Sequence, residues 1–119
     1  MVFETLSDIH KSAIMIILGY IDFNKVRPFV VNKGKPYDVY IGRPSKWSNR
    51  WSHLDNSIAE FKVDTRLEAI QKYEEWVRSQ PDMMAIIKEE LKGRILRCHC
   101  DPYLCHGHIL AWIANFEEE

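Results

Sequence analysis

RILRCHCDPYLCHGH, at residues 94–108, is the stretch that decides the fold. It holds all three cysteines and three of the five histidines of the 119-residue chain. Its apolar start predicts a strand over residues 94–100, Pro102 marks a turn, and the apolar spacing that follows predicts a helix over 105–116. Open α/β sheets bind ligands where such a strand ends, so we expect a chemical site here.

Two further strands and two further helices are expected along the chain. Strands are predicted over 27–32 and 37–41, because turn-forming residues follow each of these apolar runs. A capping box at Thr65 predicts the start of a helix over 66–78. A second amphipathic helix follows and is expected to end at Gly93.

The first residues of the chain carry one more expected helix. Apolar spacing predicts it over 7–18, although the β-branched residues of 13–18 also fit a strand. We treat 1–23 as an extension to a core of 25–116, within a single domain of 1–119. The order of elements indicates a small three-layer α/β domain with a short, partly parallel sheet and this N-terminal helix added. The same helix offers a surface for a homodimer.

The composition is that of an ordinary globular protein, with 46% hydrophobic and 28% charged residues. No apolar run approaches the roughly 20 residues of a membrane span, and no basic segment of a secretory signal opens the chain. An odd number of crowded cysteines does not suit a secreted disulfide framework. These features favour a reducing cytoplasm and no membrane partner.

Charge is unevenly distributed although the net charge is only −1. Residues 24–53 contain seven lysines and arginines against a single acid, Asp38, which gives this segment a charge of +6. The rest of the chain is correspondingly acidic. Such asymmetry suggests a face for an anion, although short loops are also basic by chance.

The cysteines suggest a metal site as one interpretation. Cys98 and Cys100 share a face of the predicted strand, since alternate residues of a strand point the same way. With Cys105 and His106 or His108 they supply enough ligands for a tetrahedral zinc ion. The spacing differs from the paired knuckles of structural zinc sites, and neighbouring Cys105 and His106 would hardly reach one ion. Zinc on Cys98, Cys100, Cys105 and His108 therefore stays an alternative, as does a role of Cys98 as a small buried hydrophobic residue.

An anion site is the other interpretation. The amides and dipole of a helix start attract phosphate, and Gly107 permits close backbone approach. His106 and His108 can donate hydrogen bonds or move a proton near neutral pH. Cys105, at the helix start, is expected to have a lowered thiol pKa and to serve as a nucleophile. Asp101 is a candidate acid or base, which makes Cys105, His106 and Asp101 the candidate catalytic residues.

The loop over 42–57 offers a second wall for the same site. It lacks periodicity, and long loops in small domains are more often functional than idle. If the strands over 37–41 and 94–100 are adjacent and parallel, both end at one edge of the sheet. The start of the loop, at Gly42, then lies beside Cys100 and the residues that follow it.

Basic and aromatic side chains are interleaved in this loop. Arg43 suits bidentate binding of a phosphate, and Lys46 adds a point charge. Trp47 or Trp51 suits stacking on a nucleobase, although both are equally good core residues.

Two segments, Tyr37–Asn49 and Cys98–His108, resemble the family called domain of unknown function 4326, whose members occur in phages and bacteria. The resemblance covers roughly residues 25–115 and rests on a glycine-arginine strand end and a later cysteine-histidine motif. Carried over by position, it points to Gly42, Arg43, Lys46, Trp47, Asn49, Cys98, Cys100, Pro102, Cys105, His106 and Gly107.

The chain departs from the family pattern at three positions. Ser48 replaces a glycine, Arg50 replaces a proline, and His108 replaces an aspartate. If that aspartate acts as an acid or base elsewhere in the family, its loss here favours binding over catalysis.

We therefore expect a small cytoplasmic domain that binds a phosphorylated nucleotide-type ligand, in the host cytoplasm if a phage encodes it. Any reaction would be transfer or hydrolysis at a glycosidic or phosphate bond, and no cofactor is needed. One alternative is a zinc-binding structural or protein-interaction module. Another is a nucleic-acid-binding protein that uses the +6 segment, which the overall charge of −1 makes weaker.

Overall fold

Three short parallel strands form the centre of the fold in the computed structural model, which describes residues 16, 21–32, 34–43, 45–54, 59–98 and 104–117. The strands are β1 (Val30–Val31), β2 (Val39–Tyr40) and β5 (Leu96–Arg97). They lie in the order β1-β5-β2, and Leu96 is level with Val30 on one side and Val39 on the other. The predicted α/β class with a short parallel sheet is therefore confirmed.

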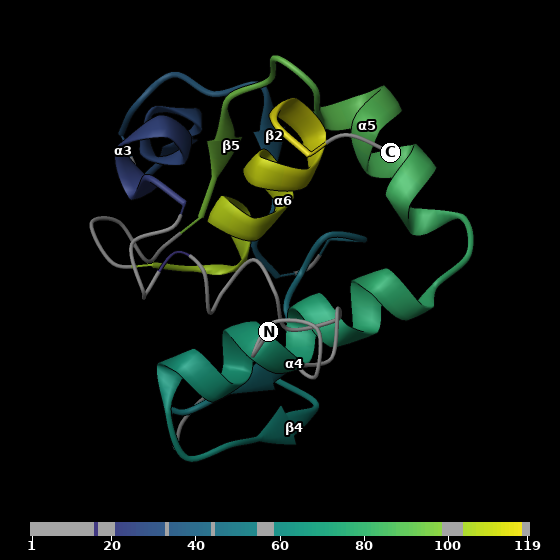
Figure 1. Ribbon diagram of the computed structural model, residues 1–119. Coiled ribbons are helices and arrows are strands. Elements are labelled where there is room, and N and C mark those ends of the chain that lie inside the picture. The colour runs from purple at the N-terminus through teal and green to yellow at the C-terminus, as the bar shows by residue number, and fades with distance from the viewer. Residues whose placement is uncertain are drawn as a thin grey trace.

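One face of this sheet is covered by helix α6 (His106–Asn115), which lies across β5 and β2 in Figure 1. The helix approaches the sheet closely at Gly107. A Cβ atom added to Gly107 would lie 2.6 Å from Ile41 Cδ1 and 3.3 Å from Val30 Cγ1. Glycine is therefore the residue that lets the first turn of α6 pack against the strands.

Two other helices follow one another along the chain, α4 (Arg66–Ser79) and α5 (Met83–Leu91). Both agree with the sequence prediction. The Thr65 hydroxyl accepts a hydrogen bond from the Glu68 amide at 3.0 Å, and the Glu68 carboxylate accepts one from the Asp64 amide at 3.0 Å. The hydroxyl satisfies a first-turn amide that the helix itself leaves without a partner, and the carboxylate holds the residue that precedes the cap.

The helices and the sheet enclose a shared core. Both α4 and α5 contact α6, and Figure 1 shows α5 beside α6 and α4 at the opposite end of the molecule. The core residues are buried aliphatic and aromatic side chains from α4, α5 and α6 and from the central strands and their ends. Among them are Val30, Ile41, Ile70, Tyr73, Val77, Ile87, Leu91, Leu96, Ile109, Leu110 and Ile113.

One prediction for the first part of the chain needs correction, and another falls outside the described residues. The chain turns through a short helix α3 (Phe23–Val26) and a 3-10 helix η2 (Arg27–Phe29) before β1 begins, so no strand covers 27–29. Pro28 explains the difference, because proline lacks the amide that a central strand would need. The helix expected over 7–18 lies outside the described residues except for Ile16, which is helical and buried.

The loop expected over 42–57 contains an unpredicted strand. Strand β3 (Trp51–Ser52) pairs in parallel with β4 (Phe61–Lys62), which makes a second, two-stranded sheet beside α4. The Trp51 ring stacks on the Phe61 ring with centroids 5.5 Å apart. This small sheet therefore holds the loop in place against α4.

Candidate functional site

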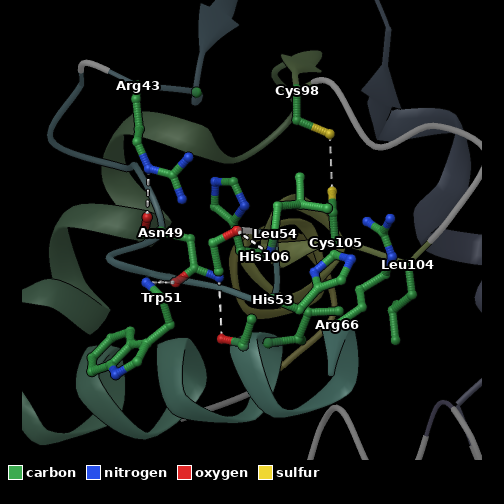
Figure 2. Close-up of a pocket in the computed structure, with 14 residues that line it drawn as sticks. Arg43, Asn49, Trp51, His53, Leu54, Arg66, Cys98, Leu104, Cys105 and His106 are labelled. Atoms are coloured by element: carbon green, nitrogen blue, oxygen red, sulfur yellow. Dashed lines mark hydrogen bonds between the residues drawn. The ribbon is translucent and has the colours of Figure 1, made fainter. Parts of the chain in front are cut away.

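A cavity of about 230 Å³ opens at the carboxyl ends of β2 and β5, against the first half of α4. Figure 2 shows the residues that line it, with Arg43, Asn49 and Trp51 on one side and the two cysteines on the other. The lining residues are Gly42, Arg43, Asn49, Trp51, Ser52, His53, Leu54, Arg66, Ala69, Ile70, Cys98, Leu104, Cys105 and His106. The glycine-arginine corner and the cysteine-histidine corner of the sequence thus border one cavity.

The Arg43 wall is built from backbone and side-chain hydrogen bonds around Asn49. Arg43 Nε donates to the Asn49 carbonyl at 3.0 Å, which fixes the orientation of the guanidinium. The buried Asn49 side chain donates to the Ala69 carbonyl at 3.1 Å and accepts from the Trp51 amide at 2.9 Å. Asn49 therefore ties the loop to helix α4, and its part in the site is to hold Arg43 and Trp51.

A larger side chain would not fit at Gly42, at the end of β2. A Cβ atom there would lie 2.4 Å from the Tyr40 hydroxyl oxygen, because the tyrosine ring folds back over the glycine. That hydroxyl donates to the Arg43 carbonyl at 2.9 Å. The contact fixes the corner at which the chain leaves the sheet and enters the cavity wall.

The cavity lining carries positive and titratable groups. Arg43, Arg66, His53 and His106 lie on it, and none of the lining residues that the structure describes is acidic. The remaining surface is largely apolar, from Leu54, Leu104 and the α4 side chains. A basic cavity with apolar walls favours a ligand that has both an anionic and an apolar part.

Cys98 and Cys105 lie in direct contact on the far wall. Their sulfur atoms are 3.0 Å apart, and both residues are free cysteines that are almost completely buried. Cys105 is the N-cap of α6, where its amide donates to His108 Nδ1 at 2.9 Å. The start of α6 is thus capped by its own residues.

His106 is held with a defined proton arrangement. Its Nε2 atom lies 2.9 Å from the Ile41 carbonyl oxygen, which can only accept, so Nε2 carries a proton. In the neutral ring Nδ1 is then the basic nitrogen. The ring packs edge-on to Tyr73 with centroids 4.9 Å apart.

Tyr73 lies behind the cavity lining, against His106, as a neutral hydroxyl. Its oxygen donates to the Trp47 carbonyl at 2.7 Å, and the residue is completely buried. Burial, and to a smaller extent the nearby charge of Cys105, raise the pKa of Tyr73 well above its ordinary value of about 10.

Several residues expected at the site lie elsewhere. Lys46 is exposed and pairs with Glu90 at 2.7 Å, outside the cavity. Trp47 is only 3% exposed and belongs to the core. Gly107 packs on the sheet, and buried His108 contacts the Phe23 ring, so neither lines the cavity. The structure thus places these four residues away from the cavity lining.

Two other predicted residues cannot be placed. Cys100 and Asp101 lie outside the described residues. Within the described part of the chain, no three histidine, cysteine, aspartate or glutamate side chains are grouped as metal ligands would be.

Arg66 and His53 are cavity residues that the sequence analysis did not select. Arg66 stands in the predicted capping box directly after Thr65, and His53, in the loop over 42–57, is expected at the surface. A usable signal was that the Thr65 helix start follows a loop that leaves the carboxyl edge of the sheet, where ligands bind in α/β folds.

The family model called "Domain of unknown function (DUF4326)" matches residues 29–116, which is most of the chain. The chain belongs to the DUF4326 family. Both halves of the cavity fall inside the match, whereas the first 28 residues lie before it. No curated protein and no solved structure matches the chain. None of the helices described for this DUF4326 protein has the length and apolar character to cross a membrane.

Proposed function

We propose that this DUF4326 protein binds a phosphorylated nucleotide-type ligand in the cavity between the Gly42–Leu54 and Cys98–His106 segments. The observation that carries the proposal is Arg43, whose guanidinium is oriented by the Asn49 carbonyl on a lining without a described acid. Guanidinium groups bind phosphate through paired hydrogen bonds, which are stronger than neutral ones.

The size of the cavity limits what it encloses. About 230 Å³ lies below the 300–1,000 Å³ that is usual for small-molecule pockets. The enclosed part of the ligand is therefore a phosphate with its sugar, and the remainder lies at the open rim.

Trp51 is the residue that we assign to the nucleobase. It lines the cavity and is partly exposed, while one face of its ring already stacks on Phe61. The other face suits a base, because base–aromatic stacking contributes about 1–3 kcal/mol and tolerates any base. Trp51 thus takes the place of Trp47, which is buried.

A reaction at this site would use Cys105 and His106. Cys105 is the N-cap of α6, a position at which thiolates are stabilised, and Nδ1 is the basic nitrogen of the neutral His106 ring. The chemistry that suits them is transfer or hydrolysis at a glycosidic or phosphate bond. Reactive thiols of this kind need a reducing compartment, which is the cytoplasm of the cell, or of the host if the protein is phage-encoded.

The test is a thermal unfolding screen with mononucleotides, nucleotide sugars, the matching nucleosides and inorganic phosphate. A ligand at 100 times its Kd adds about 2.7 kcal/mol to the free energy of unfolding, which is on the order of 10 °C in Tm for a domain of this size. We expect the phosphorylated compounds to stabilise the protein and the nucleosides to have little effect. The absence of a shift with every phosphorylated compound would contradict the proposal.

A Trp51→Leu variant separates the two parts of the ligand. It is expected to bind a mononucleotide about tenfold or more weakly, because stacking is lost, and to bind ribose 5-phosphate as the wild type does. Equal losses for both ligands would show that Trp51 only supports the wall.

A further inference from the structure

The two buried cysteines of the cavity wall suggest a chemistry that ligand binding does not need. Cys98 follows β5, where its amide donates to the Val31 carbonyl at 3.0 Å. Cys105 caps α6, and its amide is bonded to His108. Both backbones are thus held by separate elements of the fold, and the sulfur atoms meet 3.0 Å apart.

We propose that Cys98 and Cys105 form a peroxide-sensitive dithiol that closes to an intramolecular disulfide bond. A disulfide has a sulfur–sulfur bond of about 2.05 Å, so closure requires a movement of about 1 Å from the contact already present. Such a movement is within the reach of side-chain rotation, and the two anchored backbones need not separate.

Both cysteines border the cavity, although hardly any of their surface is open to it. Cys98 is 1% exposed and Cys105 is 2% exposed, yet both belong to the lining. A molecule the size of hydrogen peroxide enters a space of about 230 Å³ readily, whereas a bulky disulfide such as oxidised glutathione does not. Size therefore selects a small peroxide as the oxidant.

The reaction proceeds in two balanced steps. The Cys105 thiolate, favoured at the helix start, attacks one oxygen of hydrogen peroxide and the O–O bond breaks. The departing hydroxide takes a proton to become water and leaves a sulfenic acid on Cys105. The Cys98 sulfur then attacks the Cys105 sulfur and displaces hydroxide, which takes the Cys98 proton and leaves as a second water. Two thiols lose two electrons in total, and the peroxide is reduced.

Cys100 is removed by substitution so that the experiment reports on this pair alone. The C100S protein is treated with a small excess of hydrogen peroxide, quenched with catalase, alkylated with N-ethylmaleimide and weighed intact. Before oxidation it is expected to accept two alkyl groups. After oxidation it is expected to accept none, to remain a monomer, and to weigh about 2 Da less than the reduced chain.

Controls distinguish the disulfide from other oxidation products. In C98S/C100S and C100S/C105S the remaining cysteine has no partner, so we expect a sulfenic acid that dimedone traps and no closed monomer. A reducing agent should restore both thiols of C100S. The proposal would be overturned if two thiols were still alkylated after oxidation. It would also be overturned if disulfide-linked dimers were the main product, or if sulfinic acid formed in place of the intramolecular disulfide.

The wild-type chain provides a test that needs no variant to fold. Trypsin cleaves after Arg97, and an endoproteinase that cleaves before aspartate separates Cys98 and Cys100 from Cys105. Fragmentation of the linked peptide then shows which cysteine is bonded. A link between Cys98 and Cys105 supports the proposal, and a predominant link that includes Cys100 contradicts it.

Discussion

Arg43 in the cavity and Arg78 at the far end of helix α4 differ in the partners that accept their hydrogen bonds. At the far end, Arg78 Nε donates to Glu74 at 2.9 Å and the guanidinium NH groups donate to both carboxylate oxygens of Glu117 at 2.6 and 2.8 Å. At the cavity, Arg43 donates to a backbone carbonyl, and no described lining residue is acidic. Arg78 thus holds the structure together, whereas Arg43 has no acidic partner among the described lining residues, and we propose that its charge serves an external anion.

Replacement of Arg78 is expected to have the largest effect on stability. In R78M the completely buried carboxylate of Glu74 loses the cation that compensates it. Removal of one partner of a buried pair costs about 3–5 kcal/mol, and the partial exposure of Arg78 places our expectation near the lower value. Urea unfolding measures the loss.

The double variant E74Q/R78M serves as the control for R78M. It should recover part of the lost stability, because the uncompensated charge is gone. If R78M unfolds at the wild-type urea concentration, the two arginines do not differ in the way that we describe.

Replacement of Arg43 is expected to change binding more than folding. R43Q removes the guanidinium from the cavity and should weaken mononucleotide binding by about 10- to 100-fold, because hydrogen bonds to a charged group contribute about 1.5–3 kcal/mol. Calorimetric titration gives the two affinities.

K46Q is the matched control, because Lys46 is three residues away and pairs with Glu90 outside the cavity. It should bind as the wild type does. Equal losses in R43Q and K46Q would point to a diffuse basic surface and away from a cavity.

Gly107 separates packing from ligand contact at the start of α6. In G107A the new methyl group meets Ile41 Cδ1, so we expect a loss of about 1–2 kcal/mol, partly offset by the higher helix propensity of alanine. Chemical unfolding checks this. Unchanged or increased stability together with lost nucleotide binding would assign Gly107 to the ligand after all.

Tyr73 predicts a small effect that depends on pH. Its pKa is raised in the folded state, so its contribution to stability is complete below about pH 10, the ordinary tyrosine value, and is lost as the pH rises above it. Y73F should lower the free energy of unfolding by about 1 kcal/mol at pH 7, because the Trp47 carbonyl loses its donor. Between pH 10 and 11 the stability of Y73F should decline less than that of the wild type. Urea unfolding of both proteins across this pH range measures the difference. If their stabilities fall equally between pH 10 and 11, the raised pKa of Tyr73 does not contribute to stability.

The sequence was sufficient to predict that two distant corners meet. The prediction that Arg43 and Cys105 border one cavity requires adjacent, parallel strands, and β2 and β5 pair in that way. The central position of β5 between β1 and β2 could not be predicted, because a run of apolar residues does not show which neighbours it pairs with.

Other features depended on tertiary contacts that a local pattern does not contain. Strands β3 and β4 each contribute two residues, too few for alternation to appear. Trp47 and Trp51 stand in similar sequence surroundings, yet one packs in the core and the other lines the cavity. Arg66 reaches the cavity only because α4 crosses beneath it.

Nuclear magnetic resonance titration tests the central claim, a single anion site between the two corners, most directly. The Nε–H signals of Arg43 and Arg78 are followed together with the backbone amides as a mononucleotide is added. We predict saturable shifts of the Arg43 Nε–H signal and of the amide signals of residues 42–54 and 104–106. The Arg78 signal should not shift. Shifts at Arg78 and the far end of α4 alone, or no saturable shift at Arg43, would contradict the account.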